Sequence, residues 1–228
     1  MRCGMKHENI QLLIAGLMLA LIFVSGFNSY QLAKVKSMPA PVVQQGSQQG
    51  ASQQLSGVDI LPKGVPDIYG KELGISFDDV SANNPNKADA TIKKLGELDI
   101  NIKLTPDQLK RYINILYTVE NGISCEYCCG ARAIIFETGE PACGCAHSYA
   151  MRGLAKYLIT KHGQEYTDRE ILEEVGKWKT LFFPDIMSQK AAILKQNGIE
   201  LNFINIASNK YRGAEKGAAS GGSMVGGC

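Results

Sequence analysis

Apolar residues recur every three or four positions over much of the second half of the chain, which is the spacing of helices with one buried face. The residues Thr105, Pro106 and Asp107 form a typical helix start, with a capping hydroxyl, a first-turn proline and an acid near the positive end of the helix dipole. Apolar residues then follow at helical spacing up to Val119, which leaves Arg111 and Asn114 on the predicted exposed face.

The same spacing predicts four further helices, over 87–98, 146–161, 168–183 and 186–196. His147 lies one turn before Met151, so it is expected to point inward with the apolar face of its helix. His162 and Gly163 are expected to end this helix, with the glycine as its C-cap.

Shorter segments have the composition of strands. Residues 131–142 predict a β-hairpin, with the turn at Thr138 to Pro141. Segments 100–104 and 199–206 alternate apolar and polar residues, which fits a short strand or an extended connection. The predicted fold class is therefore mainly α, with a small β-hairpin at a cysteine-rich site.

The N-terminal part predicts a membrane anchor. Residues 10–27 carry no charge and, as a helix, would span about 27 Å, close to the thickness of a bilayer core. A cleaved signal sequence is the alternative, but no Ala-x-Ala site follows. Basic residues nearly balance across the segment, and a short N-terminal tail favours an extracytoplasmic position for the rest of the chain.

Composition divides the whole chain into four parts. Residues 1–36 hold the tail and the single-pass transmembrane anchor, and 37–57 form an uncharged Gln/Ser/Gly linker. Residues 58–212 are expected to fold as one globular domain, and the glycine-rich stretch 213–228 as a disordered tail. A net charge of +2 without a basic stripe argues against nucleic-acid binding, and no phosphate-loop or nucleophile motif indicates an enzyme.

Five of the seven cysteines lie within residues 125–145, and a histidine follows two positions later. A pair of thiols at two-residue spacing, a turn-rich interval and a second Cys/His group are typical of a site for one soft or borderline metal ion. The candidate ligands are Cys125, Cys128, Cys129, Cys143, Cys145 and His147.

Four ligands complete a tetrahedral structural site. We expect Cys125, Cys128, Cys143 and Cys145 to be these four, with His147 as the substitute for either of the last two. Cys129 is then spare, which is unusual for structural zinc and favours exchange of Cu(I), a cluster or redox chemistry. Disulfides between the two cysteine groups, or isolated buried cysteines, are the alternatives.

Two further side chains with sulfur atoms, Met224 and Cys228, lie near the end of the chain. On a mobile arm these could deliver or collect a soft ion, but a disordered terminus that happens to end in cysteine is the favoured interpretation.

The motifs CEYCC, CGCAH and AMRGLAKYL resemble an uncharacterised family of membrane-anchored proteins from archaea and related microbes, over roughly residues 65–184. That family implies no activity. The order of knuckle, hairpin and helix start is similar to treble-clef zinc modules, and PACGC is faintly similar to the PCYCGC lipoproteins, although Ala142 replaces their first cysteine.

The sequence thus predicts a membrane-anchored domain that binds zinc or copper. An extracytoplasmic thiol–disulfide protein and an interaction scaffold with a purely structural site are the alternatives.

Overall fold

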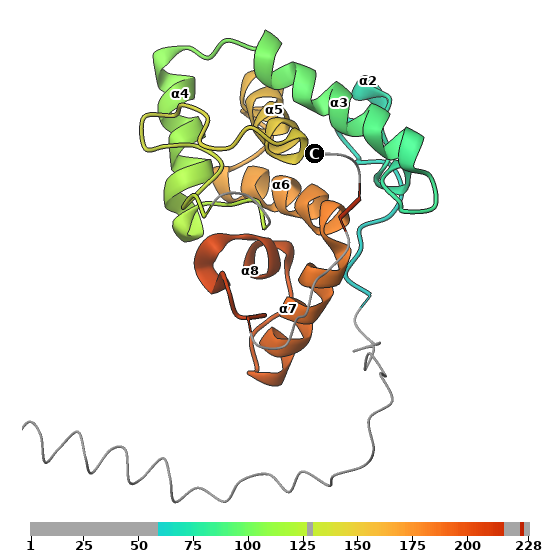
Figure 1. The fold of residues 1–228 in the computed structure, drawn as a ribbon. Coiled ribbons are helices and arrows are strands. Elements are labelled where there is room, and N and C mark those ends of the chain that lie inside the picture. Colours follow the sequence, from blue (N-terminus) through green and yellow to red (C-terminus); the bar gives the residue numbers. More distant parts are fainter. Residues whose placement is uncertain (1–58, 127–129, 217–223, 226–228) are drawn as a thin grey trace, which may run out of the picture. The chain divides into compact units, whose positions relative to one another are not determined.

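A computed structural model describes residues 59–126, 130–216 and 224–225 (Figure 1). The chain divides into two units, 1–52 and 53–228, and every described residue belongs to the second. The predicted anchor at 10–27, the whole linker at 37–57, Cys128, Cys129 and Cys228 lie outside the described residues. Among the helices that are described, none has the length and apolar character needed to cross a bilayer.

The described domain is mainly helical, which confirms the mainly α part of the predicted fold class. Its α-helices are α2 (Gly70–Leu73), α3 (Pro85–Asn101), α4 (Pro106–Ile113), α5 (Ala146–Lys161), α6 (Asp168–Phe182), α7 (Pro184–Gln196) and α8 (Phe203–Ala207). The 3-10 turns are η1 (Phe77–Asp79), η3 (Val119–Asn121) and η4 (Asn209–Tyr211), and a π-helical segment, η2 (Asn114–Thr118), continues α4.

Local chemistry explains where these helices begin. The side-chain oxygens of Thr105 and Thr167 each accept a hydrogen bond from the backbone N–H three residues later. The side chains of Gln108 and Glu170 in turn accept a hydrogen bond from the threonine N–H, which makes two reciprocal caps. Pro184 begins α7 directly after α6, where its missing N–H costs nothing. The predicted helix bounds are therefore confirmed to within a few residues.

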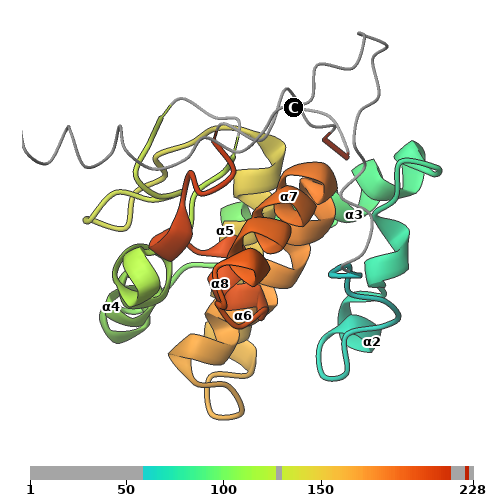
Figure 2. The same ribbon diagram turned by 90° about the horizontal axis from the view of Figure 1, so that it is seen from below.

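The centre of the domain is the pair α5 and α6 (Figures 1 and 2). Helix α3 packs along α5, and α8 packs against α6. The α3–α5 contact needs a glycine, because a Cβ on Gly153 would lie only 1.9 Å from the carbonyl oxygen of Leu95. Trp178, Phe182 and Leu154 are fully buried between these helices, so α5, which begins at the cysteine site, is fixed by the core.

The two strands of the β-hairpin predicted at 131–142 do not form among the described residues. Within the described residues, only one isolated antiparallel bridge, between Ile135 and Pro141, is found in this region. The chain does reverse there, and the Gly139 N–H donates to the Phe136 carbonyl at 2.9 Å to close the turn. Pairing stops beyond the bridge because the Ile134 N–H donates instead to the carbonyl of Ile123 at 2.9 Å.

Two further predictions need correction. Segment 199–206 is extended only at its start, because Asn202 accepts a hydrogen bond from the Asn205 N–H and begins α8. Gly163 does not end α5 through a left-handed conformation. Glycine is needed there because the backbone packs closely: a Cβ on Gly163 would lie 2.4 Å from the Ile159 carbonyl oxygen.

Candidate functional site

Three of the predicted ligands lie close together in the described structure. Cys125 and Cys143 are buried, with 4% and 6% of their surface exposed, and Cys145 is partly buried. The Sγ atom of Cys145 lies 3.6 Å from that of Cys125 and 3.7 Å from that of Cys143. These separations are far longer than the roughly 2.05 Å of a disulfide bond. The sulfurs therefore lie side by side as thiols.

The described ligands do not complete a metal site on their own. Among residues 59–126, 130–216 and 224–225, no group of three or more His, Cys, Asp and Glu side chains is arranged to hold an ion. The Sγ atom of Cys145 is close to both other sulfurs, and the candidate ligands Cys128 and Cys129 lie outside the described residues.

Cys145 occupies the N-cap of α5. Its Sγ accepts a hydrogen bond from the Ser148 N–H at 3.4 Å, as a serine or threonine oxygen would at this position. The hydrogen bond with Cys125, together with contacts from His147 and Ser148, holds the pKa of the Cys145 thiol well below its usual range, although burial opposes this. The geometry favours a thiolate at Cys145.

The backbone turns sharply before Cys125. Three consecutive residues, Glu120, Asn121 and Gly122, have φ values of 49°, 64° and 76°. The Glu120 carboxylate is held by Arg169 at 2.5 Å and Lys210 at 3.1 Å, which keeps a conformation that non-glycine residues seldom adopt. This turn directs the chain from η3 into the core as far as Cys125.

A residue from the end of the domain fastens this turn to the next segment. Asn209 donates from its backbone N–H to the carbonyl of Gly122 at 2.8 Å, and from its side chain to the carbonyls of Asn121 and Arg132 at 3.0 and 2.7 Å. Its Oδ1 accepts from Ser124 at 2.7 Å. The segments before and after 127–129 are thus held by one side chain, which no local motif indicated.

A buried ion pair holds the first cysteine segment to α6. Lys179 Nζ lies 2.5 Å from Glu126 Oε1, with side chains 0% and 7% exposed, and also donates to the carbonyl of Ala207 at 2.7 Å. Burial by itself would raise the pKa of Glu126, but Lys179 overcomes this and lowers it. Because Glu126 is committed to this pair, it is poorly suited to act as a general base.

A second buried ion pair holds the other cysteine segment to α5. Arg152 donates to the carbonyl of Cys143 at 2.7 Å and to that of Ile134 at 3.3 Å. Its Nε donates to Asp99 at 2.7 Å, and Asp99 also pairs with Lys156 at 2.7 Å. The guanidinium thus links α3, α5 and the loop that carries Cys143. Sequence analysis missed Arg152 because its partner lies on a distant helix.

His147 is fully buried, as predicted, and lies against the rings of Phe182 and Phe183 at centroid distances of 5.0 and 5.1 Å. Its Nε2 is 2.8 Å from the carbonyl oxygen of Val225. Its Nδ1 is buried and has no hydrogen-bond partner among the described residues. The imidazole therefore has one committed nitrogen and one available nitrogen.

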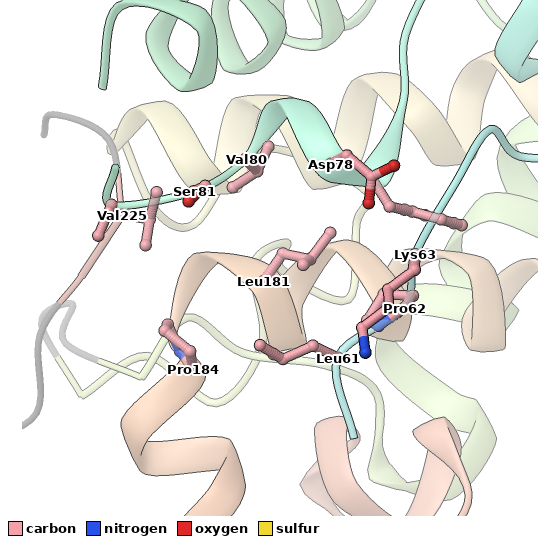
Figure 3. Close-up of a pocket in the computed structure, with 11 residues that line it drawn as sticks. Leu61, Pro62, Lys63, Asp78, Val80, Ser81, Leu181, Pro184 and Val225 are labelled. Carbon is pink, nitrogen blue, oxygen red and sulfur yellow. The ribbon is translucent and has the colours of Figure 1, made fainter. Parts of the chain in front are cut away.

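Val225 belongs to the stretch predicted to be disordered. In the structure Val225 is 5% exposed, and its N–H donates to the Phe182 carbonyl at 3.0 Å. Its side chain lines one end of a pocket of about 390 Å³, together with Val80, Leu181 and Pro184 (Figure 3). Residues 224–225 therefore pack on the domain beside α6 and the start of α5.

Three other polar residues lie away from the cysteines. His162, at the C-terminal end of α5, contacts Glu72 at 3.0 Å and Glu165 at 3.1 Å, so carboxylates are its partners. Arg111 and Asn114, predicted to be exposed, are partly buried and both bond to Asp168, at 2.6 and 2.7 Å. They join α4 to the start of α6.

Comparison with known proteins adds no family to this description. No family model, no curated protein and no solved structure matches the chain.

Proposed function

We propose that this protein is a membrane-anchored metal-binding domain, which holds a zinc or copper ion through its CxxCC and CxCxH groups. The observation that carries the proposal is the spacing of the sulfurs. Two thiolates on one tetrahedral zinc ion, with Zn–S bonds of about 2.3 Å, lie about 3.8 Å apart. The two Sγ separations around Cys145, 3.6 and 3.7 Å, are close to this value.

The chemistry of the donors supports a soft or borderline ion. Thiolates and a neutral imidazole are ligands that zinc and Cu(I) prefer, whereas calcium and magnesium prefer oxygen. Cys125, Cys143 and Cys145 supply sulfur, and the fourth ligand comes from Cys128 or His147. Cys129 is then a spare thiol, which would be available for exchange of a soft ion.

The surroundings support a preorganised site. Arg152 fixes the carbonyl of Cys143, and Lys179 fixes Glu126, the neighbour of Cys125. Both cations are fully buried and lie on helices of the core. Ligands held from rigid helices have less conformational freedom to lose when the ion binds, which raises affinity.

The test uses the full chain, purified in detergent without chelator. Metal content is measured by mass spectrometry, and accessible thiols are titrated under denaturing and native conditions. We expect about one zinc or copper ion per chain, which is lost in Cys125→Ser and retained in Cys3→Ser, the control outside the proposed site. If the bound ion is copper, a role in transport of the ion is favoured. Tight zinc with unreactive thiols would favour a structural site in an interaction scaffold.

A thiol–disulfide function is the second candidate, because the three neighbouring sulfurs could exchange disulfides as readily as bind an ion. Absence of bound metal, together with oxidised cysteines in the freshly purified chain, would reject metal binding and favour this candidate.

We propose further that the domain lies outside the cytoplasm, tethered by residues 10–27. The hydropathy and lack of charge of this segment support it. Resistance of the full chain to alkaline extraction from membranes, and protease sensitivity of the domain in intact cells, are the expected results. Release by alkaline extraction would contradict the anchor.

A further inference from the structure

A groove of about 600 Å³ lies between α3 and the first turn of α5, and its lining is mostly apolar. Ile92 and Gly96 of α3 line it from one side, and Ala146 and Tyr149 of α5 line it from the other. A Cβ on Gly96 would lie 3.3 Å from the Cβ of Tyr149, so the glycine lets the two helices approach closely at the groove. The ring of Tyr149 is held by the guanidinium of Arg152, 4.5 Å from its centroid, which gives the groove a fixed wall.

An exposed apolar side chain stands beside this groove. Ile100, in the last turn of α3, also lines it and is 62% exposed, the largest value among the large hydrophobic residues in the described part of the chain. A single exposed isoleucine on a protein surface needs no explanation. Next to an apolar groove, however, it extends one apolar patch, and such patches mark interaction sites.

The groove also carries two charges of opposite sign. Lys93 and Glu97 both line it, both are exposed, and they lie one turn apart on the same flank of α3. Within the described residues, no ion pair to either side chain is found. Unpaired charges at the rim of an apolar contact favour a partner with complementary charges, which fixes the orientation of the complex.

The surface of α3 is complementary to itself. In a two-fold dimer the same patch of both copies meets, so that residue i contacts residue j and residue j contacts residue i. Ile100 and Ile92 are each four residues from Gly96, so in an antiparallel pair centred on Gly96 the Ile100 of one copy meets the groove beside Ile92 of the other. The two-fold axis brings equal flanks together, which places each Lys93 near the Glu97 of the second copy.

We propose that this groove is a self-association surface, through which two copies of the chain form an antiparallel, two-fold dimer along α3. Ile100 of each copy fills the groove of the other, and the Lys93–Glu97 pairs set the orientation. A contact along one helix face is small compared with that of permanent dimers, so the dimer is reversible. The proposal is independent of metal binding, since none of the described cysteines lines the groove.

The test uses the full chain in detergent, with the dimer fraction measured by sedimentation velocity over a range of protein concentrations. The wild type should show a dimer fraction that rises with concentration. Ile100→Lys should weaken self-association by about tenfold or more, because it places a charge in the apolar contact. Phe136→Lys is the matched control and should associate like the wild type, since Phe136 is 55% exposed and does not line the groove.

The orientation is tested by exchange of the two charges. Lys93→Glu and Glu97→Lys each bring like charges together, so each variant alone should associate about fivefold or more weakly than the wild type. An equimolar mixture of the two variants again places opposite charges at both contacts and should dimerise as well as the wild type. Single charge variants that associate as strongly as the wild type, or a mixture that does not recover, would overturn the antiparallel arrangement.

Circular dichroism verifies that every variant keeps its helical structure. A wild-type chain that stays monomeric at every concentration would overturn the proposal, as would a dimer that Ile100→Lys does not weaken. Native mass spectrometry tests for a different occupant of the groove. A small apolar molecule that is bound to a monomeric wild type and lost in Ile100→Lys would also overturn the proposal.

Discussion

At the scale of single residues, Cys145 combines two tasks. Its Sγ caps α5 by accepting from Ser148, and the same atom lies between the sulfurs of Cys125 and Cys143. A sequence pattern cannot separate these tasks, because a cysteine at a helix start is compatible with either. Substitutions can separate them, since serine retains the cap and removes the sulfur.

We expect Cys145→Ser to keep the stability of the metal-free domain and to lose bound metal. Cys145→Ala should lose the metal and also destabilise the metal-free domain by about 1 kcal/mol, the typical cost of a missing cap. Urea unfolding with chelator present and metal analysis without it measure the two effects. Retention of metal in Cys145→Ser would contradict the role assigned to this sulfur.

Arg152 is the residue on which the loop of Cys143 depends. We expect Arg152→Met to destabilise the domain by about 3 kcal/mol, because Asp99 loses a buried partner and two carbonyls lose a donor. The double variant Arg152→Met, Asp99→Leu should recover part of this loss. Urea unfolding of both variants gives the comparison, and equal stability of Arg152→Met and wild type would refute the prediction.

At the scale of elements, α5 is tied to the domain differently at its two ends. Cysteines and His147 lie at its start, and His162 lies at its end between Glu72 and Glu165. Burial tends to lower the pKa of His162, but the two carboxylates overcome this and raise it above its ordinary value. The charged imidazole is therefore favoured in the folded state.

This shift gives stability a defined pH dependence. Because the folded pKa of His162 is raised, its contribution is fully present below the unfolded value of about 6.5 and is lost as pH rises through the folded pKa. We expect the urea midpoint of wild type, relative to that of His162→Gln, to fall as the pH rises above about 6.5 and passes through the raised pKa of His162. Parallel curves for the two proteins across this range would show that His162 is not the responsible group.

The helical elements were largely predictable. Threonine caps, Pro106 and Pro184 act through adjacent backbone groups, so their effect is visible in a few residues of sequence. The hairpin and segment 199–206 were misread because strand formation depends on a partner. Ile134 has strand propensity, yet its N–H pairs with Ile123, which lies in a different part of the chain.

At the scale of the whole molecule, residues near the C-terminal end of the domain hold the segments around the cysteines in place. Asn209 fastens the segments on both sides of 127–129, and Val225 meets the first turn of α5. The core of α3, α5 and α6 supports these contacts independently of any ion. A metal ion would therefore strengthen an existing fold rather than create one.

We expect chelation of the metal to lower the melting temperature of the full chain in detergent while most of the helical circular dichroism below the transition is retained. The reason is that an ion which binds only the folded state stabilises it in proportion to the logarithm of its concentration over the dissociation constant. Readdition of zinc should restore the melting temperature. A melting temperature that does not respond to chelator or zinc would contradict a bound ion.

The sequence by itself determined the helices, the inward direction of His147 and the group of candidate ligands, because these follow from side-chain spacing and local capping. The tertiary structure decided which sulfurs are neighbours, which cations hold them and what His147 binds. Arg152 with Asp99, Lys179 with Glu126, and His147 with Val225 each join residues that are tens of positions apart. Such pairs form only when packing brings distant segments together, so no local pattern predicts them.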